Sequence, residues 1–322
     1  MAAGDAVAQA SGMSYDDFVR TRIFEPLQMK NTVLSDAEWE NRDHAIGHHY
    51  DWKTDRLTVQ KPIETTSLGA AGAIKSTARD LANWLRFHLA GGSFNYNQIL
   101  DADALHETKM PQTVVRLENL TRELNPESNL LSYGLGWSVQ DYRRELLISH
   151  SGALNGFRTR VALMPRRQSG FVVMINSDRG TALMALRNSL ADMLSNKPSR
   201  DWNAYYLMVD RRADEKEERD RLDKRKSAPK DTRTSRPLDE LAGEYENRAY
   251  GKATIAIVNG EPVFQWSRMS IPLQHLQYDT FTAYSEWDGV DEDVVFGVEN
   301  GSVKTLTIFG QRFERTAPRS GQ

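Results

Sequence analysis

The sequence predicts an α+β fold, in which an antiparallel sheet flanked by helices is followed by a small all-β barrel. Helical spacing and short apolar strands are mixed over residues 1 to about 200. A stretch of nearly continuous charge follows, and residues 236–317 then alternate short strands with turn residues. We therefore expect a first domain over 1–200, a charged helix and linker over 201–235, and a barrel domain over 236–317.

The helices of the first domain are predicted from their caps and their ends. A first helix stops at Gly12, and the next begins at Ser14, whose hydroxyl can accept a hydrogen bond from the backbone of the first turn. That helix ends before Pro26, because the residue that precedes a proline avoids helical geometry. The same capping pattern at Thr77 predicts a helix that runs to the glycine pair 91–92.

Strands follow these helices along the chain. Apolar segments predict strands around 135–139, 146–150, 157–164 and 170–177, and another helix then begins near Arg179. The unbroken apolar run of the last strand predicts burial on both of its faces. Strands followed by a long helix are typical of an antiparallel sheet backed by helices.

The second part of the chain contains a highly charged segment and then a segment rich in predicted strands. The charged segment 201–235 predicts a solvated helix with i,i+4 ion pairs in its first half and a linker in its second half. Beyond it, Asn259-Gly260 and Asn300-Gly301 are strong hairpin signals. The candidate strands of this domain are residues 251–258, 261–267, 271–278, 279–287, 293–299 and 302–309.

The composition narrows the classes of function. The net charge is −3 and basic residues are interleaved with acidic ones, so no nucleic-acid partner is predicted. No apolar run approaches the roughly 18–20 residues of a membrane helix, so no membrane span is predicted. The chain has no cysteine, which excludes disulfide and thiolate chemistry but leaves the compartment open.

The strongest candidate for chemistry is His150-Ser151-Gly152, at the end of a predicted strand. The structural interpretation is a strand end with a small-residue turn and a partly buried histidine. The functional interpretation is a strand edge where small residues let another molecule approach the backbone closely. Backbone amides at such an edge can stabilise an oxyanion, and a histidine can transfer protons near neutral pH.

Three segments carry a resemblance to a known family. They read "SGMSYDDFVRTRIFEPLQMKNTVLS", "AAGAIKSTARDLANWLRFHLAGG" and "YGLGWSV…ISHSGALNGFRTRVALMPRRQSGFVVMINSD". In this order and spacing they resemble the middle and end of the serine hydrolases related to class C β-lactamases and D-alanyl-D-alanine carboxypeptidases. The resemblance covers residues 1 to about 200. Residues 236–317 resemble the lipocalin-like C-terminal domain of some of these peptidases.

The resemblance implies an activity and a set of site residues. These hydrolases combine a Ser-x-x-Lys nucleophile and base, a Tyr-x-Asn loop, and a Lys-Thr-Gly or His-x-Gly strand, and no metal or organic cofactor is implied. His150-Ser151-Gly152 matches the strand motif. By that match the Ala153 amide is an oxyanion donor, and His150 binds substrate or assists proton transfer. The expected substrate-binding residues are Ser151, Gly152, Asn155 and Tyr133.

Substrates by resemblance are D-amino-acid peptides, β-lactams or small esters. For two of the expected substrate-binding residues, a purely structural role is an alternative. Tyr133 is either a pocket wall or a core aromatic, and Asn155 either contacts substrate or shapes the strand turn together with Gly156 and Phe157.

The resemblance also implies that part of the site is missing. The segments that carry it contain neither Ser-x-x-Lys nor Tyr-x-Asn. We therefore expect a protein cut or started at an internal methionine. Its nucleophile, and the signal peptide of any periplasmic or secreted full-length form, would lie upstream of Met1.

The other serines of this chain are poor candidates for the nucleophile. Ser227 and Lys230 match the spacing, but a solvated linker offers no burial that would lower the lysine pKa. Ser76 is followed at that spacing by Arg79, which stays protonated and cannot act as a base. Ser151 is not in a nucleophile elbow.

A second hypothesis belongs to a different class of protein. Without a nucleophile, the chain would be a catalytically silent module that binds peptide-like ligands or forms a homo-oligomer through residues 236–317. An upstream Ser-x-x-Lys and Tyr-x-Asn would separate the two hypotheses. The other histidines predict no metal site, because His44, His48 and His49 lack ligand spacing and His88 lies on the apolar face of a helix.

Overall fold

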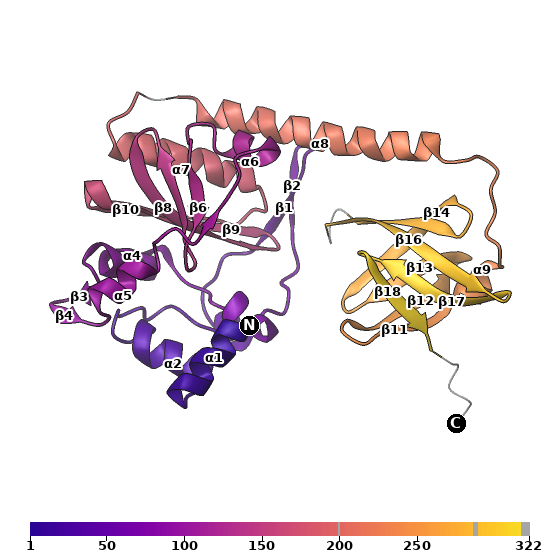
Figure 1. Ribbon diagram of the computed structural model, residues 1–322, viewed down its shortest axis with the longest axis horizontal. Helices are drawn as coiled ribbons and strands as arrows, with labels where there is room; N and C mark the ends of the chain where they lie inside the picture. Colours follow the sequence, from indigo (N-terminus) through magenta and orange to yellow (C-terminus); the bar gives the residue numbers. More distant parts are fainter. Residues whose placement is uncertain (199, 286–288, 317–322) are drawn as a thin grey trace. The chain divides into compact units, whose positions relative to one another are not determined.

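The chain forms two compact units, Met1–Asp214 and Glu215–Gln322, in the computed structural model. Residues 1–198, 200–285 and 289–316 are described (Figure 1). None of the described helices combines the length and the apolar run needed to cross a membrane.

A six-stranded antiparallel sheet forms the centre of the first unit, with strands in the order β10-β9-β8-β7-β6-β5 (Figure 1). This sheet and its covering helices confirm the predicted α+β class. The strands are β5 (Thr113–Val114), β6 (Leu131–Tyr133), β7 (Ser138–Tyr142), β8 (Glu145–Leu154), β9 (Phe157–Met164) and β10 (Ser169–Ile175).

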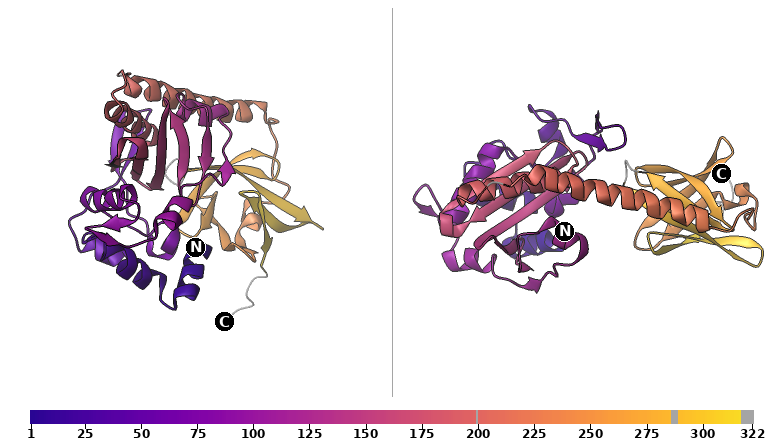
Figure 2. Two further views of the ribbon diagram at one scale, coloured as in Figure 1. Left: turned by 60° about the vertical axis from the view of Figure 1, so that its left-hand side comes forward. Right: turned by 90° about the horizontal axis from the view of Figure 1, so that it is seen from above.

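Helices cover both faces of this sheet (Figure 2). Helix α4 (Ala78–Leu89) packs Leu85 against Ile148 and Leu163 on one face. Helices α7 (Gly180–Leu194) and α8 (Trp202–Ser227) pack on the other face, where Leu147 belongs to the core cluster. Leu147 and Ile148 are neighbours on β8 and point to opposite faces, as strand geometry requires.

The predicted caps are present. Ser14 accepts from the Asp17 amide at 3.0 Å and Thr77 accepts from the Asp80 amide at 3.2 Å. Gly12, with φ of 68°, ends the first helix in the left-handed region. The remaining elements of this unit are α1 (Ala2–Ser11), α2 (Tyr15–Val19), the π-helix Arg20–Phe24, α3 (Asp36–Glu40), β1 (His48–Asp51), β2 (Arg56–Val59), the 3₁₀ turns Thr66–Ala71 and Pro165–Arg167, β3 (Ser93–Phe94), β4 (Asn97–Gln98), α5 (Ala102–Glu107) and α6 (Asn119–Leu124).

Two strand predictions were wrong. The segment around 135–139 is mainly a turn between β6 and β7, closed by a 2.7 Å bond from the Gly134 amide to the Trp137 carbonyl. Gly136 has φ of 88°, a conformation that favours glycine and ends strand geometry. Strand β10 is not buried on both faces, because Phe171 and Val173 on one face are buried whereas Met174 on the other face is 38% exposed.

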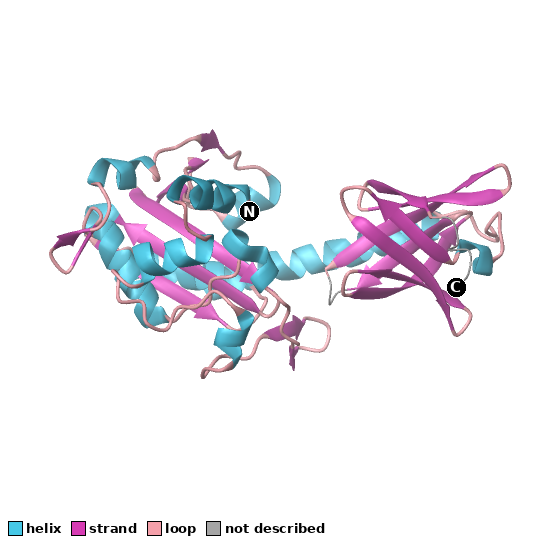
Figure 3. Cartoon of the chain, turned by 90° about the horizontal axis from the view of Figure 1, so that it is seen from below, coloured by secondary structure: helices cyan, strands magenta, loops and turns pink. Residues whose placement is uncertain are grey.

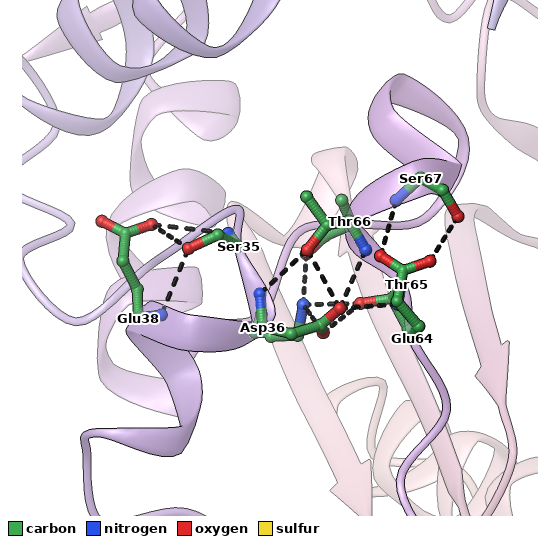
Figure 4. A network of polar contacts seen from close by, with 9 residues as sticks. Ser35, Asp36, Glu38, Glu64, Thr65, Thr66 and Ser67 are labelled. Atoms are coloured by element: carbon green, nitrogen blue, oxygen red, sulfur yellow. Dashed lines mark hydrogen bonds and ion pairs between the residues drawn. The ribbon is translucent and has the colours of Figure 1, made fainter.

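A polar network connects α3 to the loop before the 3₁₀ turn (Figure 4). Asp36 accepts from the amides of Thr65 and Thr66 at 2.7 and 2.9 Å, and pairs with the Lys75 ammonium at 2.8 Å. Burial alone would raise the pKa of Asp36, but the hydrogen bonds from Lys75 and Thr65 hold it well below its usual range. The carboxylate therefore stays charged and holds three separate segments together.

The second unit is a closed antiparallel barrel of β11 to β18 (Figure 3). Its interior side chains form one hydrophobic cluster that includes Tyr245, Phe264 and Phe281. The barrel confirms the predicted all-β domain. A short helix, α9 (Leu238–Leu241), precedes the strands, which are β11 (Gly243–Asn247), β12 (Gly251–Val258), β13 (Glu261–Trp266), β14 (Met269–Gln277), β15 (Thr280–Ser285), β16 (Val290–Glu299), β17 (Ser302–Ile308) and β18 (Gln311–Arg315).

Sequence patterns located six of these strands and missed the first and last. The Asn-Gly pairs form the predicted turns, with φ of 53° at Asn259 and 50° at Asn300. Strands β11 and β18 pair with each other and close the barrel, with Tyr245 opposite Arg315. Local turn signals do not mark that long-range pairing. The predicted strand 279–287 lies partly outside the described residues.

The end of α8 belongs to the barrel unit. Arg221 lies over the Tyr284 ring at 4.0 Å, and the Lys224 ammonium is 2.7 Å from the Asp293 carboxylate. Past the helix, the Ser235 amide donates to Asp279 at 2.7 Å. The segment that leads into the barrel is therefore attached to it.

Candidate functional site

The end of β8 has one uncovered backbone edge. On one side its residues pair with β9, with Ser151 opposite Arg160, Gly152 opposite Thr159 and Ala153 opposite Arg158. On the other side, pairing with β7 begins only at Ser149. Within the described parts of the chain, no strand pairs with residues 150–154 on the β7 side.

The neighbouring strands fix the direction of the amides on this edge. The Tyr133 carbonyl accepts from the Gln112 amide at 2.9 Å, so Tyr133 directs its backbone toward β5. Ser138, opposite Tyr133, must then direct its N–H and C=O toward Ser149 on β8. Because these directions alternate along a strand, Ser151 and Ala153 direct theirs to the uncovered side.

The residues at this edge are small and accessible. His150, Ser151 and Ala153 are all exposed. Gly152 is also exposed, but a Cβ there would lie 2.6 Å from the Thr159 hydroxyl on β9. A Cβ at position 152 would therefore force the Thr159 side chain to move, which gives this glycine a structural reason within the sheet.

His150 contacts one predicted site residue directly. The Tyr133 hydroxyl and His150 Nε2 are 3.0 Å apart, with the ring centroids at 6.2 Å. Tyr133 is 38% exposed, which excludes the core-aromatic interpretation. Although His150 reaches solvent, the protein around its ring partly desolvates it; this desolvation first, and then the nearby charge of Arg160, lower the pKa of His150. The imidazole is therefore neutral at pH 7 and can accept a proton from a hydroxyl group.

The predicted residues beyond Ala153 have mainly structural contacts. Asn155 is half-buried in the β8–β9 turn. Gly156 has φ of 75°, and a Cβ there would lie 2.7 Å from the Gly47 Cα. The His48 amide donates to the Gly156 carbonyl at 3.3 Å. The turn is therefore held against the segment before β1.

Sequence reasoning missed a second polar group near the same end of the sheet. His49 Nδ1 lies 2.6 Å from the Asp178 carboxylate, which also accepts from the Tyr50 amide at 3.1 Å. These residues are 129 positions apart, so no local pattern signals the contact. His48 instead faces the Asn176 carbonyl at 3.1 Å. The described residues contain no cluster of three or more metal ligands.

Two literal matches to the family motifs lie in the barrel unit and have structural contacts there. Ser227 ends α8, in the barrel unit, where its hydroxyl donates to the Lys224 carbonyl at 3.0 Å. A literal Tyr-x-Asn also occurs at Tyr245-Glu246-Asn247. Tyr245 is fully buried in the barrel core and donates to the Leu241 carbonyl at 2.6 Å. These contacts give both segments a structural role within the barrel unit.

Comparison with known families decides the identity of the first unit. A family model described as beta-lactamase matches residues 1–192. The chain belongs to the β-lactamase family. A second model, a domain of unknown function named DUF3471, matches residues 227–318 and so covers the barrel.

Three proteins to which the chain is similar are distant in sequence and longer than the chain. Unguisins hydrolase ungD' of Aspergillus campestris is 26% identical over 259 residues, covering 76% of this chain and 46% of that protein. Penicillin-binding protein 4* of Bacillus subtilis is 25% identical, with coverages of 54% and 38%. Beta-lactamase of Escherichia coli is 23% identical, with coverages of 54% and 49%. The chain thus spans half or less of the length of these relatives.

One solved structure shares the fold across nearly the whole chain. It is the octameric penicillin-binding protein homologue from Pyrococcus abyssi, with a TM-score of 0.53 and 20% identity. The match covers 96% of this chain and 62% of that one.

Proposed function

We propose that this β-lactamase-family chain is part of a serine hydrolase that cleaves amide or ester bonds through an acyl-enzyme, with the β8 edge as one wall of its site. The observation that supports this most is the uncovered edge, where the Ser151 and Ala153 amides face outward beside the His150–Tyr133 pair. An outward amide is what an oxyanion requires, since it can donate without rearrangement.

The residues take separate roles in this proposal. The Ala153 N–H is one oxyanion donor, and the second donor is the amide of the nucleophile. The backbone of Ser151 holds an extended, peptide-like substrate by strand addition. Neutral His150, in contact with the Tyr133 hydroxyl, binds substrate or relays a proton. The proposed substrates are D-amino-acid peptides, β-lactams or small esters.

The chain by itself is proposed to be inactive, because the nucleophile and its base lie outside its 322 residues. Incubation with a penicillin or a fluorophosphonate, followed by intact-mass spectrometry, should give no stoichiometric adduct. A one-to-one adduct on any serine of this chain would overturn that part of the proposal. The coding sequence upstream of Met1, read in frame, should contain Ser-x-x-Lys followed by Tyr-x-Asn.

A second candidate is a catalytically silent binding module. Two observations favour it. The β8 edge is open, and the one serine at Ser-x-x-Lys spacing, Ser227, belongs to the barrel unit. A stop codon directly upstream of Met1 would favour this candidate. A homo-oligomer formed through the barrel is part of it, and light scattering would show a mass above 36.6 kDa.

A further inference from the structure

Beneath helix α7, Arg160 has an incompletely bonded guanidinium. Arg160 comes from β9, and its Nη1 donates to the Ser149 hydroxyl at 3.1 Å. Its Nη2 approaches the Met184 sulfur at 3.4 Å, and a thioether is a weak acceptor. Its Nε is buried and has no hydrogen-bond partner among the described residues. Nε and Nη2 form one edge of the planar group, so that edge lacks a strong acceptor.

A second guanidinium lies close by. Arg187 follows Met184 by three residues on α7, which places both side chains on the same face of the helix. Arg187 is 1% exposed. Its nitrogens donate to Asn188 Oδ1 at 2.8 Å, Asn125 Oδ1 at 3.1 Å and the Leu124 carbonyl at 3.3 Å. All three acceptors are neutral.

Within the described parts of the chain, no carboxylate pairs with either of these cations. Burial first, and then the charge of Arg187, lower the pKa of Arg160 to about 9, so Arg160 remains charged at neutral pH. Asp192, a buried carboxylate on the same helix, is already engaged by Arg143 at 2.8 Å and by the Tyr142 hydroxyl at 2.9 Å. Buried charges are normally paired, because an unpaired one is expensive to desolvate.

We propose that Arg160, with Arg187 beside it, is a binding site for a carboxylate. The unpartnered Nε and weakly bonded Nη2 offer the two parallel donors that a carboxylate accepts in bidentate fashion. Arg160 as a residue is half-buried while its Nε is fully buried, so an anion would have to enter this edge from the exposed part of the side chain. The carboxylate comes either from a free small acid or from an acidic side chain of a longer polypeptide that contains this chain.

The test is thermal unfolding of the chain in sodium formate against sodium chloride at constant ionic strength. Formate should raise the melting temperature saturably in the parent chain and not in Arg160→Met. The matched control is Arg158→Met, because Arg158 already donates to the carbonyls of Leu154 and Phe157 at 2.8 Å. This control should keep the formate effect. An equal response in Arg160→Met, or no formate effect in the parent, would overturn the proposal.

A direct measurement covers the case in which Arg160→Met does not fold. The Arg160 Nε–H resonance of the parent chain should shift with formate, while that of Arg158 stays in place; an unmoved Arg160 signal would count against the site. The source of the carboxylate is decided by an upstream-extended polypeptide. Loss of the formate effect, together with a lower melting temperature in Arg160→Met, assigns an internal acid. A retained effect assigns a free anion.

Discussion

At the scale of single residues, the sequence offered candidate site residues but not the partners of their side chains. His150 was predicted as a site residue from a strand motif. Its contact with Tyr133 joins two residues 17 positions apart across a turn, and no periodicity gives that pairing. The caps at Ser14 and Thr77 were predictable because donor and acceptor lie within three residues of each other.

His88 shows what a buried, unpaired imidazole does to stability. It lies between Trp84 and Trp137, with ring centroids at 4.3 and 4.9 Å, and neither ring nitrogen has a hydrogen-bond partner among the described residues. Burial first, and then the charge of Lys109, lower the pKa of His88 from 6.5 to about 3. Its predicted place on the apolar face of a helix is confirmed, since it is 6% exposed.

We expect His88 to make the first unit acid-sensitive. Below pH 6.5 His88 is protonated in the unfolded chain, whereas in the folded chain it stays neutral down to about pH 3. The free energy of unfolding therefore falls as pH falls through that window. Between pH 7 and pH 5 the loss should be about 2 kcal/mol. Urea unfolding of His88→Phe should lack this part of the pH dependence. The exposed His106→Phe should retain it, and equal slopes in both variants would refute the account.

At the scale of elements, strands were predictable where turns were local. The Asn-Gly pairs located two barrel hairpins, whereas β11 and β18 escaped because their pairing closes the barrel over a long sequence separation. The apolar run 170–177 suggested burial on both faces, but Met174 on β10 is 38% exposed. A run of apolar residues does not by itself show whether a helix will cover both faces of the strand.

The β8–β9 turn gives a test of how firmly the candidate site is supported. Gly156→Ala places a Cβ 2.7 Å from the Gly47 Cα at φ of 75°, so it should lose about 2–3 kcal/mol of unfolding free energy. Gly136→Ala is the matched control, with φ of 88° and no atom within 4 Å of the new Cβ. It should lose about 1 kcal/mol from backbone strain alone. Equal losses in denaturant unfolding would show that the contact with Gly47 does not support the turn.

At the scale of the whole molecule, the class of each domain followed from patterns that recur within it. The closure of the barrel and the open side of β8 did not, because both depend on which strands are neighbours. The relatives extend well beyond the region that this chain matches.

The barrel should fold independently of the first unit, because it has its own closed sheet and core. A fragment 215–322 should unfold cooperatively. A fragment from 234 lacks Arg221 and Lys224, which contact Tyr284 and Asp293, and should be less stable by about 1–2 kcal/mol. Calorimetry of the two fragments measures this difference. A gradual, non-cooperative transition in the longer fragment would contradict the independence of the barrel.

The most direct test of the central claim is an amide titration of this chain by NMR with a dipeptide of D-alanine. The account predicts that the Ser151 and Ala153 amide resonances shift with ligand, because they face the uncovered side of β8. Gly152 and Leu154 are internal controls, since their amides face β9, and they should move much less. If all four amides move alike, or none moves, the β8 edge is not the wall of a peptide-binding hydrolase site.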